Sequence, residues 1–219
     1  MERSAEAFGE SAVHSAARRV SRGLMEGLEQ GRVSPGQRLV ETDLAAEYGV
    51  GRNAVREAIQ WLAAHNAVDV ARFRSAAIRR LGPQETLDVL SVAEPLTGLM
   101  ARAAAERYEA ARHEAALAPA LDELEQADDE AQPGAFSRGR RHFYRTMLEI
   151  GDNRELHRLF PALGLHILHA QYRSAGLRRA RLQDFQAMAE AIRRKDSGAA
   201  EAAGRIYVQR LREAVLGAG

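Results

Sequence analysis

The stretch GVGRNAVREAI, residues 49–59, places Arg52 and Arg56 four positions apart at the start of a predicted helix. Residues four apart lie on the same face of a helix, so the two guanidinium groups are neighbours. Asn53 stands between them, and two glycines around a valine predict a tight turn just before the helix. The stretch therefore predicts a turn followed by a helix that presents polar side chains on its first turns.

The flanking sequence extends this pattern on both sides. Apolar periodicity predicts a helix over 12–30, and a short helix over 40–49 follows with Thr42 as its N-cap. A longer helix is predicted over 52–65, and a small β-hairpin with alternating apolar residues over 68–78. The predicted buried positions are Val20, Leu24 and Leu28 in the first helix and Val55, Ile59 and Leu62 in the third. This order of elements describes a winged helix-turn-helix.

Such a helix has the geometry of a DNA recognition helix, whose N-terminal residues meet base edges in the major groove. Arginine pairs with guanine and asparagine with adenine, so Arg52 and Asn53 are candidate base readers. Arg56, one turn on, is placed to reach a base or a phosphate. Arg72 and Arg74, at the predicted hairpin tip, are candidates for the minor groove or the DNA backbone.

The amino-acid composition limits the classes of protein to which the chain can belong. The chain has 219 residues, enough for two modest domains or one large one, and a net charge of +1. Of these residues 28% are charged, 46% hydrophobic and 5% aromatic, which suits helices better than sheets. The chain has no cysteine, so a disulfide framework, cysteine-ligated zinc and a cysteine nucleophile are excluded. No apolar run approaches the roughly 20 residues of a membrane span, and no signal peptide is evident. We therefore expect a cytoplasmic protein with no membrane partner.

From Pro83 onward the sequence predicts only helices. The helical stretches run over 84–109, 111–128, 134–150, 153–173, 177–195 and 197–217, with short connections between them. Short connections between helices imply an antiparallel bundle. We expect a mainly α protein of two domains, a DNA-binding domain over 1–80 and a six- to seven-helix bundle over 81–219.

Residues 35–68, PGQRLVETDLAAEYGVGRNAVREAIQWLAAHNAV, resemble the DNA-binding domain of GntR-type transcriptional regulators. The resemblance implies that Arg52 and Arg56 contact operator DNA and that Arg38 supports them. The sequence departs from the usual pattern at Gly51, where serine is common, at Ala54, where proline is common, and at Phe73, where glycine is common. The complete set of expected DNA contacts is Arg38, Thr42, Gly51, Arg52, Asn53, Arg56, Arg72 and Arg74.

The second half resembles the effector-binding domain of the FadR branch of that family. The resemblance rests on residues 93–107, 143–156 and 191–211. Many members of the branch bind a divalent metal through an Asp-x-x-x-His pair and two further histidines. At the corresponding positions this chain has Arg140, Tyr144, Phe185 and Tyr207, none of which matches the ligand types that zinc prefers. We therefore expect no metal and no other cofactor.

These four residues suggest a different ligand. Arg140 would bring a permanent charge that binds a carboxylate or phosphate through paired hydrogen bonds, while Tyr144 and Tyr207 add hydroxyls and Phe185 an apolar wall. The alternative is equally compatible with the sequence: Arg140 points to solvent and the aromatic rings merely fill the bundle. His166 and His169 have metal-compatible spacing on one helix, but the absence of further ligands favours a packing or surface role.

The sequence thus predicts a homodimeric regulator of transcription that binds double-stranded operator DNA and a small-molecule effector. Repression relieved by an organic acid or other anion is the favoured mode. Two alternatives stay open, a regulator whose bundle only dimerises and one that responds to an acyl-CoA. An enzyme is disfavoured, because no nucleophile–base motif or phosphate loop is present.

Overall fold

The computed structural model describes residues 2–70, 76–127, 134–172 and 175–217. Contacts between Cα atoms divide the chain into two compact units, residues 1–80 and 81–219. None of the described helices is long and apolar enough to cross a membrane.

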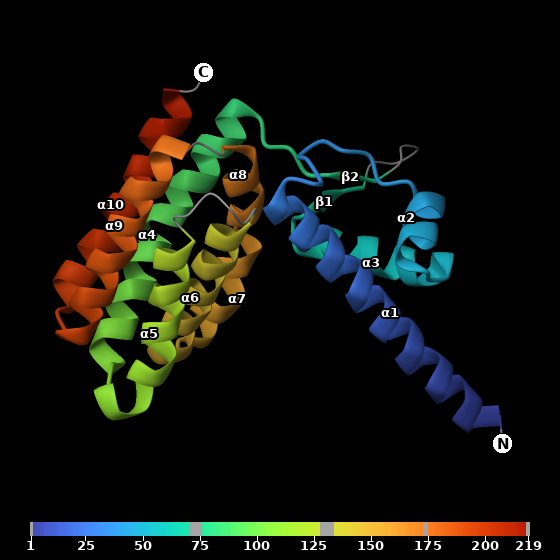
Figure 1. Cartoon of the computed structure of the whole chain (residues 1–219), viewed down its shortest axis with the longest axis horizontal. Helices are drawn as coiled ribbons and strands as arrows, with labels where there is room; N and C mark the ends of the chain where they lie inside the picture. The colour runs from blue at the N-terminus through green and yellow to red at the C-terminus, as the bar shows by residue number, and fades with distance from the viewer. Residues whose placement is uncertain (1, 71–75, 128–133, 173–174, 218–219) are drawn as a thin grey trace. The chain divides into compact units, whose positions relative to one another are not determined.

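Unit 1 is a winged helix-turn-helix (Figure 1). Its helices are α1 (Glu2–Gln30), α2 (Glu41–Tyr48) and α3 (Arg52–Ala64). Strands β1 (Val68–Asp69) and β2 (Ala77–Ile78) follow and pair antiparallel. The helix α1 begins ten residues before the predicted start at residue 12.

The core of unit 1 forms where the apolar stripes of its helices meet. The expected positions on α1 and α3 are buried, with exposures from 0% to 6%. They are Val20, Leu24, Leu28, Val55, Ile59 and Leu62. Because one face of α3 is fixed in this core, its other face is left for contacts outside the unit.

The turn between α2 and α3 depends on glycine, but the start of α2 differs from the prediction. Gly49 ends α2 with φ 59°, a left-handed conformation that glycine adopts without steric cost. The N-cap of α2 is Val40, in an extended conformation and with no side-chain cap. Thr42 lies inside the helix and donates a hydrogen bond to Asp43 Oδ1 at 3.2 Å. The prediction of Thr42 as the N-cap was therefore wrong.

The wing is a short sheet held by its backbone. Val68 pairs with Ile78 and Asp69 with Ala77, and Arg38 makes a further antiparallel bridge to Ala77. The tip, residues 71–75, lies outside the described residues. The expected DNA contacts Arg72 and Arg74, and the departure at Phe73, fall there and stay untested.

Unit 2 is an all-helical bundle (Figure 1). Its described part contains seven helices: α4 (Pro83–Arg107), α5 (Ala110–Gln126), α6 (Ala135–Gly151), α7 (Arg154–Ala162), α8 (Leu165–Gln171), α9 (Ala175–Arg193) and α10 (Ser197–Leu216). The prediction of one helix over 153–173 was wrong, because Gly164 takes φ 65° and separates α7 from α8.

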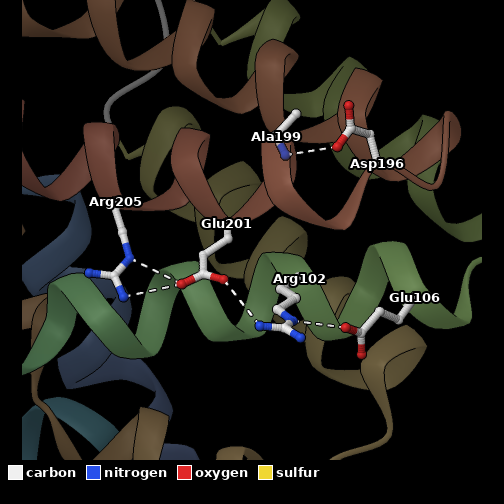
Figure 2. A network of polar contacts seen from close by, with 6 residues as sticks. All are labelled: Arg102, Glu106, Asp196, Ala199, Glu201 and Arg205. Carbon is white, nitrogen blue, oxygen red and sulfur yellow. Dashed lines mark hydrogen bonds and ion pairs between the residues drawn. The ribbon is translucent and has the colours of Figure 1, made fainter.

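The helices α4 and α10 pack closely against each other. A Cβ atom built on Gly204 of α10 would lie 2.8 Å from the Thr97 carbonyl oxygen of α4. On the rim of this contact, Arg102 of α4 forms an ion pair with Glu201 of α10 at 3.5 Å (Figure 2). Glu201 also accepts from Arg205 at 3.1 Å, so charged groups follow the seam between the two helices.

Candidate DNA-binding surface and effector site

The first turns of α3 leave their polar side chains outside the core. Arg52 and Asn53 are exposed, whereas the next two residues, Ala54 and Val55, are buried. Within the part of the chain that the structure describes, the side chains of Arg52 and Asn53 make no hydrogen bond or ion pair. Their donors are therefore available to a partner outside unit 1.

Arg56 differs from Arg52 because it already has a partner. Its Nε donates to Glu41 Oε2 of α2 at 2.8 Å, and both side chains are more than one-third exposed. Exposed ion pairs of this kind contribute about 0–1 kcal/mol, so little free energy holds Arg56 on Glu41. Arg56 can therefore exchange Glu41 for another anionic partner at little cost in free energy.

The other described candidates surround this face. Arg38, Thr42 and Gly51 are exposed. Gly51 is the N-cap of α3 and offers no side-chain cap, and a Cβ there would meet nothing within 4 Å. A seryl side chain would therefore fit, so the departure at Gly51 changes a contact and not the fold. Trp61 of α3 is half exposed and stacks on His65, with ring centroids 3.9 Å apart.

In unit 2 the aromatic residues predicted for the effector site do come together. The Tyr144 ring of α6 lies 5.9 Å from Phe185 of α9 and 6.4 Å from Tyr207 of α10, centroid to centroid. Phe185 and Tyr207 are 5.0 Å apart. All three are buried, so three separate helices contribute one aromatic cluster.

Arg140 lies one turn before Tyr144 on α6 and is only 5% exposed. Of the two alternatives left open by the sequence, the orientation toward solvent is therefore wrong. Burial raises the pKa of the Tyr144 hydroxyl well above its usual value, and the neighbouring Tyr207 raises it further, so it stays protonated. The Arg140 guanidinium acts on that pKa in the opposite direction, which places its charge close to the hydroxyl.

His169 of α8 joins this cluster. Its Nε2 lies 3.2 Å from the Tyr207 hydroxyl, and its ring is 3% exposed. Burial holds the pKa of His169 well below its usual value, and the Arg140 and Arg181 charges act in the same direction. The imidazole is therefore neutral at physiological pH.

Sequence reasoning missed Arg181 of α9, which is 6% exposed. The signal available was its position four residues before Phe185, which places both on one face of α9. Sequence reasoning also missed the pair between Asp184 of α9 and Arg210 of α10, which are hydrogen-bonded. Burial raises the pKa of Asp184 to about 6, although Arg210 opposes the shift.

The residues at the four positions do not fit a divalent metal. Arginine and phenylalanine offer no lone pair to a cation, and the two tyrosines are held protonated or hydrogen-bonded inside the bundle. No group of three or more His, Cys, Asp or Glu side chains within the described ranges is arranged to hold a metal ion. The donor set favours an anion instead.

A winged helix-turn-helix with an exposed arginine-bearing helix, followed by a helical bundle with a buried polar cluster, defines a class of two-domain DNA-binding regulators. Residues 16–78 match the model for bacterial regulatory proteins of the gntR family, and residues 88–210 match the FCD domain. The chain belongs to the GntR family and has a C-terminal FCD domain, as expected. It is a DNA-binding transcriptional regulator and not an enzyme.

Solved structures share this fold over nearly the whole chain. Escherichia coli McbR/YncC aligns with a TM-score of 0.77 and 22% identity, covering 93% of this chain and 98% of that one. A protein described as a transcriptional regulator GntR from Rhodococcus sp. RHA1 aligns with a TM-score of 0.78 and 20% identity, covering 94% and 99%.

A curated relative is described as a probable D-xylose utilization operon transcriptional repressor of Paenarthrobacter nicotinovorans. The two sequences are 23% identical over 141 residues, which is 64% of this chain. The match spans 62% of the relative's length.

Proposed function

We propose that this regulator binds a pseudo-palindromic operator as a homodimer and is released from it by a small organic anion bound inside the FCD domain. One observation carries the proposal: Arg140 is buried beside the hydroxyl of Tyr144, at positions where many relatives have metal ligands. A guanidinium binds a carboxylate or a phosphate through two parallel, charge-assisted hydrogen bonds. The ligand would therefore be a carboxylate or phosphate held by Arg140, Tyr144 and Tyr207 against the ring of Phe185.

On the DNA side, Arg52 and Asn53 would read base edges in the major groove. Arg56 would leave Glu41 for a base or a phosphate, and Arg38 and Thr42 would hold the DNA backbone. The backbone N–H groups at Gly51 start a helix and so suit a phosphate. The wing arginines Arg72 and Arg74 would complete the contact at the minor groove. The relative that is described as a repressor supports repression, and not activation, of transcription by this regulator.

The homodimer would form through the outer face of α4 and α10. Val92 and Leu99 lie seven residues apart on one face of α4, and Ile206 lies on the adjacent α10; all three are more than 40% exposed. Large apolar side chains exposed together mark contact surfaces. Leu99→Glu should therefore convert a dimer into a monomer in light scattering, whereas Glu106→Gln, at the edge of the same face, should not.

The effector proposal is tested by thermal melting of the full chain with carboxylates, sugar phosphates, acyl-CoAs and divalent metals, each with and without chelator. A ligand at about 100 times its Kd adds roughly 2.7 kcal/mol to the free energy of unfolding, a readily measured shift. Stabilisation by an anion that resists chelator and is lost in Arg140→Ala would support the proposal. Stabilisation by Zn²⁺ that chelator reverses would refute it.

A second measurement separates effector binding from a bundle that only dimerises. DNA duplexes selected by the wild-type chain from a random pool serve as the probe, and release by the stabilising anion is followed by fluorescence anisotropy. We expect Tyr207→Phe and Arg140→Gln to bind the selected DNA normally and to resist release. Equal release of wild type and both variants would show that the anion acts elsewhere.

A further inference from the structure

The chain enters the bundle at Leu81, and one side chain at the end of α8 holds that residue. Leu81 is the first residue of unit 2 and directly follows Arg80, the last residue of unit 1. The Gln171 amide donates from Nε2 to the Leu81 carbonyl oxygen at 2.9 Å. Its Oε1 accepts from the Leu81 N–H at 3.1 Å. Gln171 therefore pairs with both backbone polar groups of a residue that is only 4% exposed.

The residue after Gln171 lies against the same junction. The Tyr172 hydroxyl is 3.4 Å from Gln171 Nε2 and 3.4 Å from Thr86 Oγ1 of α4. Thr86 is buried, and its hydroxyl donates to the Gly82 carbonyl oxygen at 2.8 Å. The junction is thus held both from α4 and from the end of α8. We call the two hydrogen bonds between Gln171 and Leu81 the linker clamp.

The short helix that carries Gln171 also reaches the aromatic cluster. Helix α8 spans only Leu165–Gln171, and its His169 lies 3.2 Å from the Tyr207 hydroxyl, measured from Nε2. Residues two apart in an α-helix point about 200° apart around its axis, so His169 and Gln171 lie on nearly opposite faces of α8. A displacement of α8 on the side of the cluster therefore moves the linker clamp as well.

A second contact ties the end of α8 to the cluster. Arg181 of α9 is 6% exposed, and its Nη2 donates to the Tyr172 carbonyl oxygen at 3.4 Å. The charge of Arg181 lowers the pKa of both His169 and Tyr144, so the guanidinium lies close to the cluster. A shift of Arg181 there would reach Tyr172 and, beside it, Gln171.

We propose that Gln171 is a positioning residue that couples effector binding in the cluster to the DNA-binding unit. This inference rests on the proposed anion site and adds its route to the DNA. An effector bound beside Tyr207 and His169 displaces α8, Gln171 releases Leu81, and the chain that enters the bundle gains freedom. Two DNA-binding units on freer linkers lose the arrangement that an operator with two half-sites requires, so the DNA is released.

The two hydrogen bonds of the linker clamp are enough for such a switch. One intramolecular hydrogen bond shifts an equilibrium by about 2- to 12-fold. Two of them shift a two-state equilibrium by about 5- to 150-fold, which is the usual range of coupling between two sites. Opening the linker clamp therefore suffices to weaken DNA binding measurably, without any change inside unit 1.

The contact itself is tested without an effector. Hydrogen exchange of the full chain, followed by mass spectrometry, reports the Leu81 N–H in the peptide that contains it. Gln171→Ala removes both hydrogen bonds, so this peptide should exchange at least about 5-fold faster than in the wild type. The matched control is Gln186→Ala on α9, whose exposed amide donates to Glu125 at 2.8 Å. Equal exchange in all three proteins would overturn the linker clamp.

The route from the cluster is tested with Arg181 variants. Arg181→Met keeps most of the apolar stem but removes the donor to the Tyr172 carbonyl oxygen, far along the chain from Leu81. We expect it to speed exchange of the Leu81 peptide by about 2- to 12-fold. Arg181→Lys keeps a donor and should restore part of the protection. A Leu81 peptide that exchanges equally in the wild type and both variants would overturn the route.

Coupling to DNA is measured by anisotropy on duplexes selected by the wild type, with succinate and glucose 6-phosphate as probes. Without a probe, Gln171→Ala should bind this DNA about 5- to 150-fold more weakly. Its remaining affinity should be nearly insensitive to both probes, although thermal melting still shows that they bind. A folding defect would instead weaken the binding of DNA and of the probes together, and that result would overturn the coupling.

The outcomes separate this inference from the proposed function. Faster exchange at Leu81 with wild-type release of DNA in Gln171→Ala would overturn the coupling and leave the anion effector standing. Failure of both probes and of the wider anion screen to bind the wild type would overturn the proposed function, and effector control through Gln171 with it. Hydrogen exchange would still report the linker clamp in that case.

Discussion

Replacing Gly204 by alanine tests the close contact between α4 and α10. The added Cβ would lie 2.8 Å from the Thr97 carbonyl oxygen, 3.0 Å from its carbon and 3.1 Å from Cα of Gly98. All three atoms belong to the backbone of α4, so no side chain can rotate away and the two helices must separate. Overpacking of this kind costs about 1–3 kcal/mol, offset by up to about 1 kcal/mol for alanine in a helix.

We therefore expect a net loss of about 1 kcal/mol and a drop of about 2–4 °C in the melting temperature, measured by differential scanning calorimetry. Tyr207 follows one turn later on α10, so its hydroxyl should also move from its position 3.2 Å from His169 Nε2 and weaken anion binding. The control is Gly198→Ala near the start of α10, where the nearest atom would be 3.7 Å away. A Gly204→Ala variant as stable as this control would refute the close helix contact.

Three further outcomes are expected. Arg52→Ala should weaken binding to selected DNA about 5- to 150-fold, the 1–3 kcal/mol of one base-reading pair, whereas Arg145→Ala in unit 2 should not, as anisotropy would show. His169 has a lowered pKa, so stability in urea should fall as pH drops below its unfolded value of about 6.5, and His169→Gln should flatten that slope. Asp184 has the opposite sign: its pKa is raised from 3.8 to about 6, so wild-type stability should gain from protonation between these values as pH falls. Asp184→Asn should remove this gain, and an unchanged pH profile would contradict the assignment.

Much of unit 1 could be predicted because its signals are local. The apolar stripe of α3, at Val55, Ile59 and Leu62, follows the helical period, and burial of one face leaves Arg52 and Asn53 on the other. The turn before α3 needs a left-handed residue, and Gly49 provides it. The prediction of Thr42 as the N-cap of α2 was wrong, because the position of a cap depends on the backbone dihedral angles. Val40 takes the extended conformation of an N-cap there, although its side chain caps nothing.

In the bundle, the resemblance to a family predicted four positions that lie close together. It did not predict that the charged side chain of Arg181 is buried in the same bundle. Arg140, Tyr144, Phe185 and Tyr207 were found through their places in a known pattern, and their roles remain proposals. The break between α7 and α8 was missed although Gly164 was visible, because an isolated glycine is tolerated in many helices. Only the fold shows that this glycine has φ 65°.

The sequence by itself determined the fold class, the family and the helix that we propose to face DNA, since periodicity, turn residues and motif spacing are properties of neighbouring residues. Tertiary structure alone decided that Arg140 and Arg181 are buried and that His169 meets Tyr207. Those facts depend on how α6, α8, α9 and α10 pack, which brings together residues as much as 67 positions apart, from 140 to 207. The electrostatics of the site follow from that burial, because charge and hydrogen-bonding groups act strongly only where water is excluded.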